Sequence, residues 1–322
     1  MAAETNTIMS ADLAYARQVE FTFKFNGGIR KLLEAIGTTR VIPKVAGTVL
    51  KAYKATGTLQ DGNVAEGELI PLSQYITEEV PLAEIKLKKW RKQTTAEAII
   101  EKGRDQAVLQ TNDAMLKDVQ KGIRSDFFGY LASGTGSANG ATFQATLAKA
   151  WGQLQVLFED DDIDAVYFMN PLDVADYLAT ANITLQSAFG MTYVKDFLGL
   201  GTVIFNSGVP QGKIYATAAD NIVFYYIPTN TGDMGETFDF VTDETGFIGI
   251  NETPDHDYMT VKNTVASGIA MFAERLDGVV VGTIGEEVVD DENGGGAGDD
   301  VPGEGGDDVT GGDDENGEST GA

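Results

Sequence analysis

The chain has 322 residues, 43% of them hydrophobic and 22% charged, a composition typical of a globular protein with a sizeable core. It contains no cysteine, which excludes disulfides, thiolate metal sites and cysteine nucleophiles. The net charge is −26, but 14 of the 49 acidic residues lie between Glu286 and Ala322, a segment without Lys or Arg. The remaining body has a balance of −12, which argues against a nucleic-acid-binding surface because phosphate contacts require Lys and Arg.

The sequence shows neither a membrane span nor an export signal. No apolar stretch approaches the roughly 20 residues needed to cross a bilayer. Met1 to Glu20 lacks the basic region and apolar core of a signal peptide. We therefore expect a protein that has no contact with a membrane and is made in a reducing cytoplasm.

Residues 1–47 are predicted to form an N-terminal arm followed by a short helix. Val19–Phe25 alternates apolar and polar residues with a period of two, which indicates a strand. Apolar residues between Ile29 and Ile36 recur at helical spacing and indicate a short helix that Gly37 ends.

Residues 48–93 are predicted to form a long, projecting β-hairpin. Extended runs at 49–55 and 69–92 flank a polar, Gly-rich stretch at 57–67. Two strands of about a dozen residues would project roughly 40 Å. Because little of the tip can be buried against the chain's own core, we expect the hairpin to contact another molecule.

Residues 94–141 are predicted to contain a long spine helix. Thr94–Glu97 has the pattern of a capping box, in which hydroxyl and carboxylate groups satisfy the free N–H groups of a helix start. Apolar residues then recur at helical spacing to about Leu131, a length on the order of 50 Å. Gly103 and Gly122 each weaken this helix by about 1 kcal/mol relative to Ala.

Residues 142–285 alternate short helices and strands, which together with the preceding parts predict an α+β fold. A flexible Gly-rich loop, Ser133–Gly140, is expected just before a helix from Thr142 to Glu159. The later elements are expected at Ala165–Met169, Pro171–Leu178 (a helix), Val203–Phe205, Lys213–Ala216, Ile222–Ile227 and Tyr258–Gly282. Residues 286–322 are predicted to be disordered, because a Gly, Asp and Glu tail buries too little surface to offset its chain entropy.

The sequence offers no catalytic, metal or cofactor site. His256, the only histidine, lies between two aspartates, and without a partner motif a polar loop is favoured over a metal site or a triad. Asp160, Asp162 and Asp164 imitate the start of a calcium loop but lack its Gly and its final Glu. Neither a dinucleotide nor a P-loop fingerprint occurs. We predict no enzyme activity and no cofactor.

Charged residues of the hairpin and its returning strand are the candidate contact surface. The basic residues between Lys86 and Lys92 are divided by strand alternation between two faces and follow several acids. This arrangement favours charge pairing between subunits over contact with DNA. The candidate inter-subunit residues are Lys51, Lys54, Glu66, Glu78, Glu79, Glu84, Lys86, Lys88, Lys89 and Arg91.

The order of these parts resembles the major capsid proteins of tailed bacteriophages, the Hong Kong 97-type fold. Val64–Gly67 with Ile70–Pro71 resembles the Glu-Gly segment of that family's extended loop. Val80–Trp90 resembles the returning strand, which enters the spine helix through a Ser/Thr-rich cap, here Thr94–Thr95.

Motifs in the second half extend the resemblance to about residues 15 to 285. Ala165–Pro171 is similar to the strand that ends in Asn-Pro in the family's axial domain. Phe197–Phe205 with Val209–Lys213 is similar to the region that follows. The resemblance implies a capsid fold with an N-terminal arm, an extended hairpin loop, a spine helix, and peripheral and axial domains.

The resemblance also implies a function. The chain would assemble in the host bacterial cytoplasm as pentamers and hexamers into the icosahedral head of a virion, enclosing double-stranded DNA without sequence-specific contact. A scaffolding protein, a portal and a maturation protease are implied as partners. An encapsulin-type nanocompartment shell is the alternative, followed by a surface-displayed adhesive protein.

Overall fold

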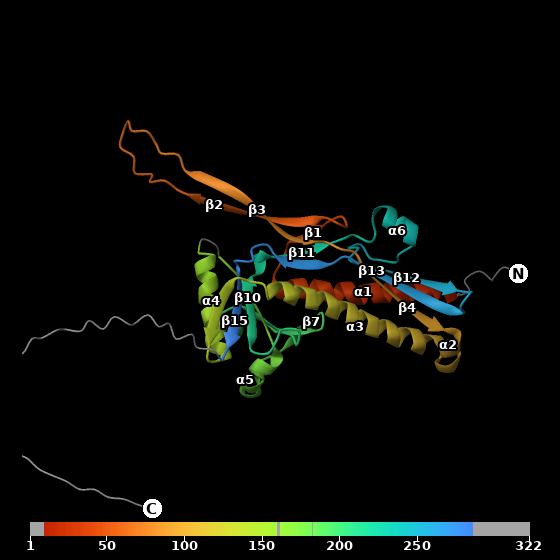
Figure 1. The fold of residues 1–322 in the computed structure, drawn as a ribbon. Helices are drawn as coiled ribbons and strands as arrows, with labels where there is room; N and C mark the ends of the chain where they lie inside the picture. The colour runs from red at the N-terminus through yellow and green to blue at the C-terminus, as the bar shows by residue number, and fades with distance from the viewer. Residues whose placement is uncertain (1–9, 160–161, 182, 286–322) are drawn as a thin grey trace, which may run out of the picture. The chain divides into compact units, whose positions relative to one another are not determined.

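The computed structural model describes residues 10–159, 162–181 and 183–285 (Figure 1). The chain divides into two units, 1–287 and 288–322, and every described residue belongs to the first. The tail predicted to be disordered lies outside the described residues, as does Asp160 of the acidic turn. Among the described helices, none combines the length and apolar character needed to span a bilayer.

The N-terminal part of the first unit is a single helix, α1 (Ser10–Ile36). The predicted strand at 19–25 is therefore wrong, and so is the extended arm as far as it concerns residues 10–25. The alternation also fits a helix, because Phe21 and Phe25 are four residues apart and both are buried. Phe23, which a half-buried strand would place on the same face, is 75% exposed.

The predicted hairpin is present as a separate two-stranded antiparallel sheet of β2 (Val49–Thr58) and β3 (Gln74–Glu84). Figure 1 shows it extending away from the helices and sheets of the same unit. Leu50 and Ile85, at its root, are buried in a cluster with residues of a neighbouring sheet. The hairpin is thus anchored at one end only.

The extended run predicted at 69–92 is two strands rather than one. β3 ends at Glu84, and β4 (Lys88–Thr95) belongs to a different sheet, where it pairs with β13 (Thr260–Ser267). The chain leaves the hairpin where Ile85 enters the core. In the sequence, apolar and polar residues alternate through both strands without a visible break. The buried Ile85 marks the point where the chain passes from one sheet to the other.

The predicted spine is two helices, α2 (Ala96–Lys102) and α3 (Arg104–Leu131), which end and begin at Gly103. Gly103 has φ 79° and ψ 144°, a conformation that glycine alone adopts readily, so the weak point predicted there is a complete break. The cap is also shifted by one residue, because the Thr95 hydroxyl accepts a hydrogen bond from the N–H of Ala98. The predicted end at Leu131 is confirmed.

A three-stranded antiparallel sheet, here called the peripheral sheet, lies beside the spine, in the order β12-β13-β4. Its first strand, β12 (Ile248–Asp255), contacts α1. An excursion containing α6 (Gly232–Phe238), which the sequence did not predict, precedes β12, and Val241 forms an isolated antiparallel bridge with Ile250. The excursion therefore covers the β12 edge of the sheet.

A seven-stranded sheet, here called the axial sheet, has the order β5-β15-β10-β6-β9-β8-β7. The strands predicted near Ala165, Val203 and Lys213 are confirmed, and α4 (Phe143–Leu157) begins at the predicted cap, Thr142. The strands and short helices are β5 (Gly136–Gly140), β6 (Ala165–Met169), η1 (Pro171–Val174), α5 (Ala175–Thr180), β7 (Gln186–Ala188), β8 (Met191–Val194), η2 (Phe197–Gly199), β9 (Thr202–Phe205), β10 (Lys213–Ala218), η3 (Ala219–Asn221) and β15 (Val279–Ile284).

The axial sheet is covered on both faces. In β6, Val166 and Phe168 join the core that contains residues of α1 and α3, whereas Ala165, Tyr167 and Met169 join the core under α4. All five residues are buried, as expected for a strand between two layers of helix.

The flexible loop predicted at 133–140 is wrong in its second half, which is strand β5, parallel to β15. The glycines are there because the strands approach closely. A Cβ atom at Gly134 would lie 2.6 Å from a side-chain carbon of Val279, and one at Gly136 would lie 2.9 Å from a side-chain carbon of Val280. Glycine in this segment indicates a close approach of backbones rather than flexibility.

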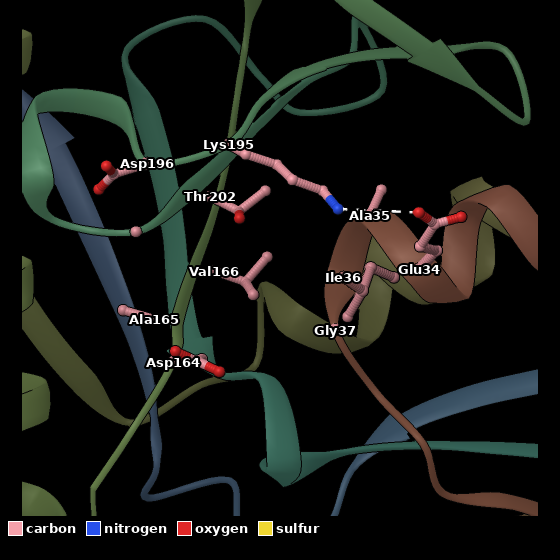
Figure 2. A pocket seen from close by; sticks show the side chains of 11 residues that line it. Glu34, Ala35, Ile36, Gly37, Asp164, Ala165, Val166, Lys195, Asp196 and Thr202 are labelled. Carbon is pink, nitrogen blue, oxygen red and sulfur yellow. Dashed lines mark ion pairs between the residues drawn. The ribbon is translucent and has the colours of Figure 1, made fainter.

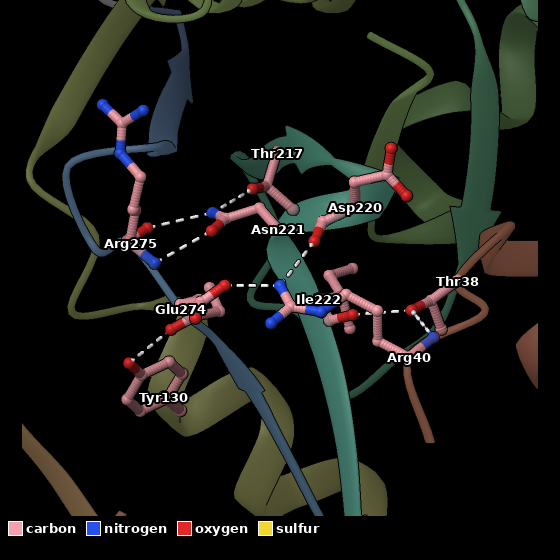
Figure 3. Close-up of polar contacts among 10 residues, drawn as sticks. Thr38, Arg40, Tyr130, Thr217, Asp220, Asn221, Ile222, Glu274 and Arg275 are labelled. Carbon is pink, nitrogen blue, oxygen red and sulfur yellow. Dashed lines mark hydrogen bonds and ion pairs between the residues drawn. The ribbon is translucent and has the colours of Figure 1, made fainter. Parts of the chain in front are cut away.

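A third sheet of β1 (Val41–Pro43), β11 (Ile222–Tyr226) and β14 (Ala270–Ala273) connects the hairpin root to the body. Figure 3 shows the polar contacts at its end. Arg40 forms an ion pair with Glu274 and also donates to the backbone oxygen of Asp220. Asn221 donates to Thr217 and to the backbone oxygen of Arg275. The Arg40 contacts hold the segment that leads from α1 into the hairpin, and the Asn221 bonds join the end of β10 to the segment that follows β14.

Candidate functional site

The two most exposed aliphatic side chains of the described residues lie at the hairpin tip, together with two others. Leu69 is 95% exposed and Leu72 is 93% exposed, while Leu59 and Ile70 are each more than 70% exposed. The two sides of the tip are joined by a hydrogen bond from the N–H of Gln60 to the Ser73 hydroxyl. Scattered apolar residues are normal on a surface, whereas four on one projecting tip make this tip a candidate contact surface.

Several candidate contact residues pair within their own chain. Lys51 pairs with Glu79 across the hairpin. Lys86 Nζ lies 3.4 Å from a carboxylate oxygen of Glu84, two residues earlier in the sequence.

Lys88 of β4 pairs with Asp126 of α3 and so ties the peripheral sheet to the spine. These pairs are exposed, so each adds about 1 kcal/mol or less to stability.

The side chains of some remaining candidate contact residues are described by the structure, and those of others are not. Lys54 and Glu78 are opposite each other in the register of β2 and β3, but their side chains lie outside the described part. Glu66, at the hairpin tip, and Lys89 and Arg91, on β4, are exposed. Within the described ranges, no acid pairs with Lys89 or Arg91 and no base with Glu66. These three charges are available to another molecule.

Strand alternation divides β4 as the sequence analysis expected. Lys88, Trp90, Lys92 and Thr94 are partly or fully buried, while the residues between them, including Lys89 and Arg91, are exposed. The basic run is therefore two separate surfaces, one turned toward α3 and one toward solvent.

A polar cluster under α3, missed by the sequence analysis, surrounds the buried face of β4. Arg104 Nη2 lies 2.9 Å from Glu252 Oε1, and the Asn263 amide donates to the same carboxylate at 3.1 Å. Lys92 donates to the backbone oxygen of Val108 and to the Thr111 hydroxyl. Burial lowers the pKa of Lys92 to about 8, against the opposing effect of Glu252. In the sheet register Glu252, Asn263 and Lys92 are opposite one another, but only pairing of strands distant in sequence reveals this.

His256 lies in the turn between β12 and β13, where the sequence favoured a polar loop. Its neighbour Asp255 pairs with Lys262, and that ion pair lowers the pKa of Asp255. No three His, Cys, Asp or Glu side chains in the described part of the chain are grouped to hold a metal ion. Nothing at this turn adds a partner that would make His256 a base or a ligand.

A cavity of about 260 Å³ lies between the end of α1 and the axial sheet (Figure 2). Lys195 Nζ reaches within 3.9 Å of a Glu34 carboxylate oxygen across it, and Asp164 and Asp196 also line it. Among the residues that line it there is no histidine. The charged contact that the structure shows across it is this Lys195–Glu34 ion pair.

Comparison with known proteins identifies the architecture. No family model and no curated protein matches the sequence. The fold is similar to a structure of Gordonia phage Cozz, with a TM-score of 0.51 and 12% identity over 80% of this chain and 87% of that one. It is also similar to the capsid asymmetric unit of cyanophage A-1(L), with a TM-score of 0.50 and 14% identity over 80% of this chain and 93% of that one.

A holo-SrpI encapsulin complex from Synechococcus elongatus matches with a TM-score of 0.46 and 11% identity, over 78% of this chain and 86% of that one. The two higher-scoring matches, to Gordonia phage Cozz and to the cyanophage capsid, cover most of both chains. The chain therefore has the phage major capsid protein fold.

Proposed function

We propose that this protein is the major capsid protein of a tailed phage, a structural rather than catalytic subunit that assembles into the shell of the virion around double-stranded DNA. The observation that carries the proposal is the hairpin tip, where the aliphatic side chains of Leu59, Leu69, Ile70 and Leu72 are exposed in the free chain. The fold shared with phage capsid structures supports the same reading.

Burial of the tip against a neighbouring copy would supply the energy of assembly. Four aliphatic side chains contribute roughly 1.5–3 kcal/mol each when fully transferred from water to an apolar contact. A shell tolerates modest contacts, because each subunit makes many at once and effective concentration replaces strong pairwise affinity. We propose pentamers and hexamers as the units, with a separate scaffolding protein, a portal and a maturation protease as partners.

The charges fit a container. The body carries a balance of −12, so an inner wall of this composition would not hold phosphate backbones tightly. Lys51, Lys86 and Lys88 are satisfied within the chain, which leaves Glu66, Lys89 and Arg91 as the proposed inter-subunit charges.

The test is to express the full chain alone and with its candidate scaffolding protein and to image the products by negative-stain electron microscopy. Closed shells or hexamer tubes in either condition would support the proposal. Uniform monomers or dimers in both conditions would contradict it. Shells that package a co-expressed enzyme rather than DNA would favour the nanocompartment alternative.

A further inference from the structure

The two edges of the peripheral sheet carry unpaired charges of opposite sign. If the chain self-assembles as proposed, the charged edge of one copy can contact the oppositely charged edge of the next. We call Lys89 and Arg91 of β4 the basic stripe. We call Phe238, Asp239 and Glu244, in the excursion around α6, the acidic knob. The stripe lies at the open edge of the sheet and the knob at the covered edge.

The basic stripe is unmatched on its own sheet. β4 is the last strand in the order, so nothing in the described part of the chain pairs with its outer edge. Its partner strand places Ala266 opposite Lys89 and Thr264 opposite Arg91, neither of which carries a charge. An edge strand with two free cations is protected against nonspecific pairing but suited to an acidic partner.

The acidic knob is equally unmatched and is held firmly. Between Lys213 and Lys262 the sequence has no Lys or Arg, so the whole excursion is acidic. Phe238 is 58% exposed and stacks on Phe240 with ring centroids 5.8 Å apart. The Asn251 amide of β12 donates to the backbone oxygens of Phe238 and Asp239, at 3.1 and 3.0 Å. These bonds hold the backbone of Phe238 and Asp239, so the exposed ring and the adjacent Asp239 carboxylate lie on a fixed segment.

Both surfaces are fixed to one sheet, on opposite sides of β12 and β13, as Figure 1 shows for α6 and β4. From β4 to the bridged residue Val241 is three strand spacings, roughly 14 Å. The two complementary patches therefore have the same separation and relative orientation in every copy. A head-to-tail contact between such patches repeats from copy to copy, and it generates a closed ring when the rotations of successive copies add up to a full turn.

We propose that the acidic knob of one copy docks on the basic stripe of the next, in a head-to-tail contact within each ring of subunits. Phe238 provides the apolar anchor, against which the Arg91 guanidinium can stack. Asp239 and Glu244 pair with Lys89 and Arg91. The hairpin tip, with Asp61, Glu66 and Glu68, is the other acidic surface that could reach the stripe, and the experiment separates the two.

The test is a charge swap in the full chain, with assembly measured by sedimentation and electron microscopy under the condition in which the wild type assembles. Lys89→Glu with Arg91→Glu, and separately Asp239→Lys with Glu244→Lys, should each lower shell yield by about tenfold or more, because like charges then meet. All four substitutions in one chain should restore assembly. Lys117→Glu with Lys121→Glu, on the exposed face of α3, makes the same charge change as the stripe variant and should leave shell yield within about twofold.

Circular dichroism and urea unfolding establish that each variant is folded. Failure of the four-substitution chain to assemble, while folded, would overturn the proposal. So would rescue of the stripe variant by Asp61→Lys with Glu66→Lys, which would assign the stripe to the hairpin. Unchanged yield in both two-substitution variants would also overturn it, whereas a wild type that never assembles would contradict the proposed function itself.

Discussion

The axial sheet and the hairpin use apolar residues in opposite ways. In β6 all five residues are buried between helices of the same chain, and Phe168 packs edge-on against Phe127 and Phe128. In the hairpin, the described residues beyond the root are exposed on both strands, and the tip ends in aliphatic side chains. The first region stabilises the subunit, whereas in the proposed shell a neighbouring copy covers the second. Substitutions should therefore separate stability from assembly.

The largest effect is expected in the axial sheet. Phe168→Ala removes a fully buried ring that contacts two others, and should lower the free energy of unfolding by about 3–5 kcal/mol. Urea unfolding of unassembled subunits measures this directly. A loss below about 1 kcal/mol would show that the axial core is not the stabilising region.

The hairpin tip should show the reverse behaviour. Leu69→Ser, Ile70→Ser and Leu72→Ser together should lower shell yield by about tenfold or more, because apolar anchors dominate contact energies. Each change should alter the free energy of unfolding by no more than about 0.5 kcal/mol, since the side chains are exposed.

Asn63→Ser, in the same tip, removes no apolar surface and is the matched control. It should assemble like the wild type. Normal shells from the triple variant would remove the basis for assigning assembly to the tip.

Two glycines of the spine should respond with opposite signs. Gly122 lies inside α3 with open space around it, so Gly122→Ala should raise the free energy of unfolding by about 1 kcal/mol. Gly103 has a positive φ, so Gly103→Ala should lower it by about 1–3 kcal/mol despite the same open space. Thermal unfolding of the two variants compares them, and equal shifts would contradict the break between α2 and α3.

The smallest effect is the pH dependence of Lys92. Its pKa is about 8 in the folded chain and near 10.5 when unfolded, so the unfolded state binds the proton more tightly between those values. Stability contributed by this group is therefore present above about pH 10.5 and is lost as pH falls through 8.

Lys92→Met removes this titration. The unfolding free energy of the wild type minus that of the variant should rise as pH increases from 8 to 10, in urea titrations at each pH. A difference that stays constant would mean that Lys92 is not desolvated in the folded chain.

The sequence correctly predicted the elements whose formation depends on nearby residues, such as caps, turns and strand alternation. The hairpin follows from two extended runs around a Gly-rich segment, and α4 follows from its Thr142 cap. Long-range packing determined the rest. Residues 19–25 fit two periodicities, and burial of Phe21 and Phe25 against the body selects the helix.

For the same reason, the sequence could not show which of the candidate contact charges are paired within the chain. A basic run in the sequence shows that charges are present, but not that Lys51 and Lys88 pair within the chain while Lys89 and Arg91 do not. The α6 excursion carries no periodic signal, so the acidic knob became visible only once β12 and β4 were placed at opposite edges of one sheet.

The central claim is that the hairpin tip is completed by a neighbouring copy. Hydrogen exchange of residues 59–73, compared between unassembled subunits and assembled particles, tests it most directly. The account predicts fast exchange in the free subunit and strong protection in the particle, while the axial strands are protected in both. Equally fast exchange of the tip in both states would contradict it.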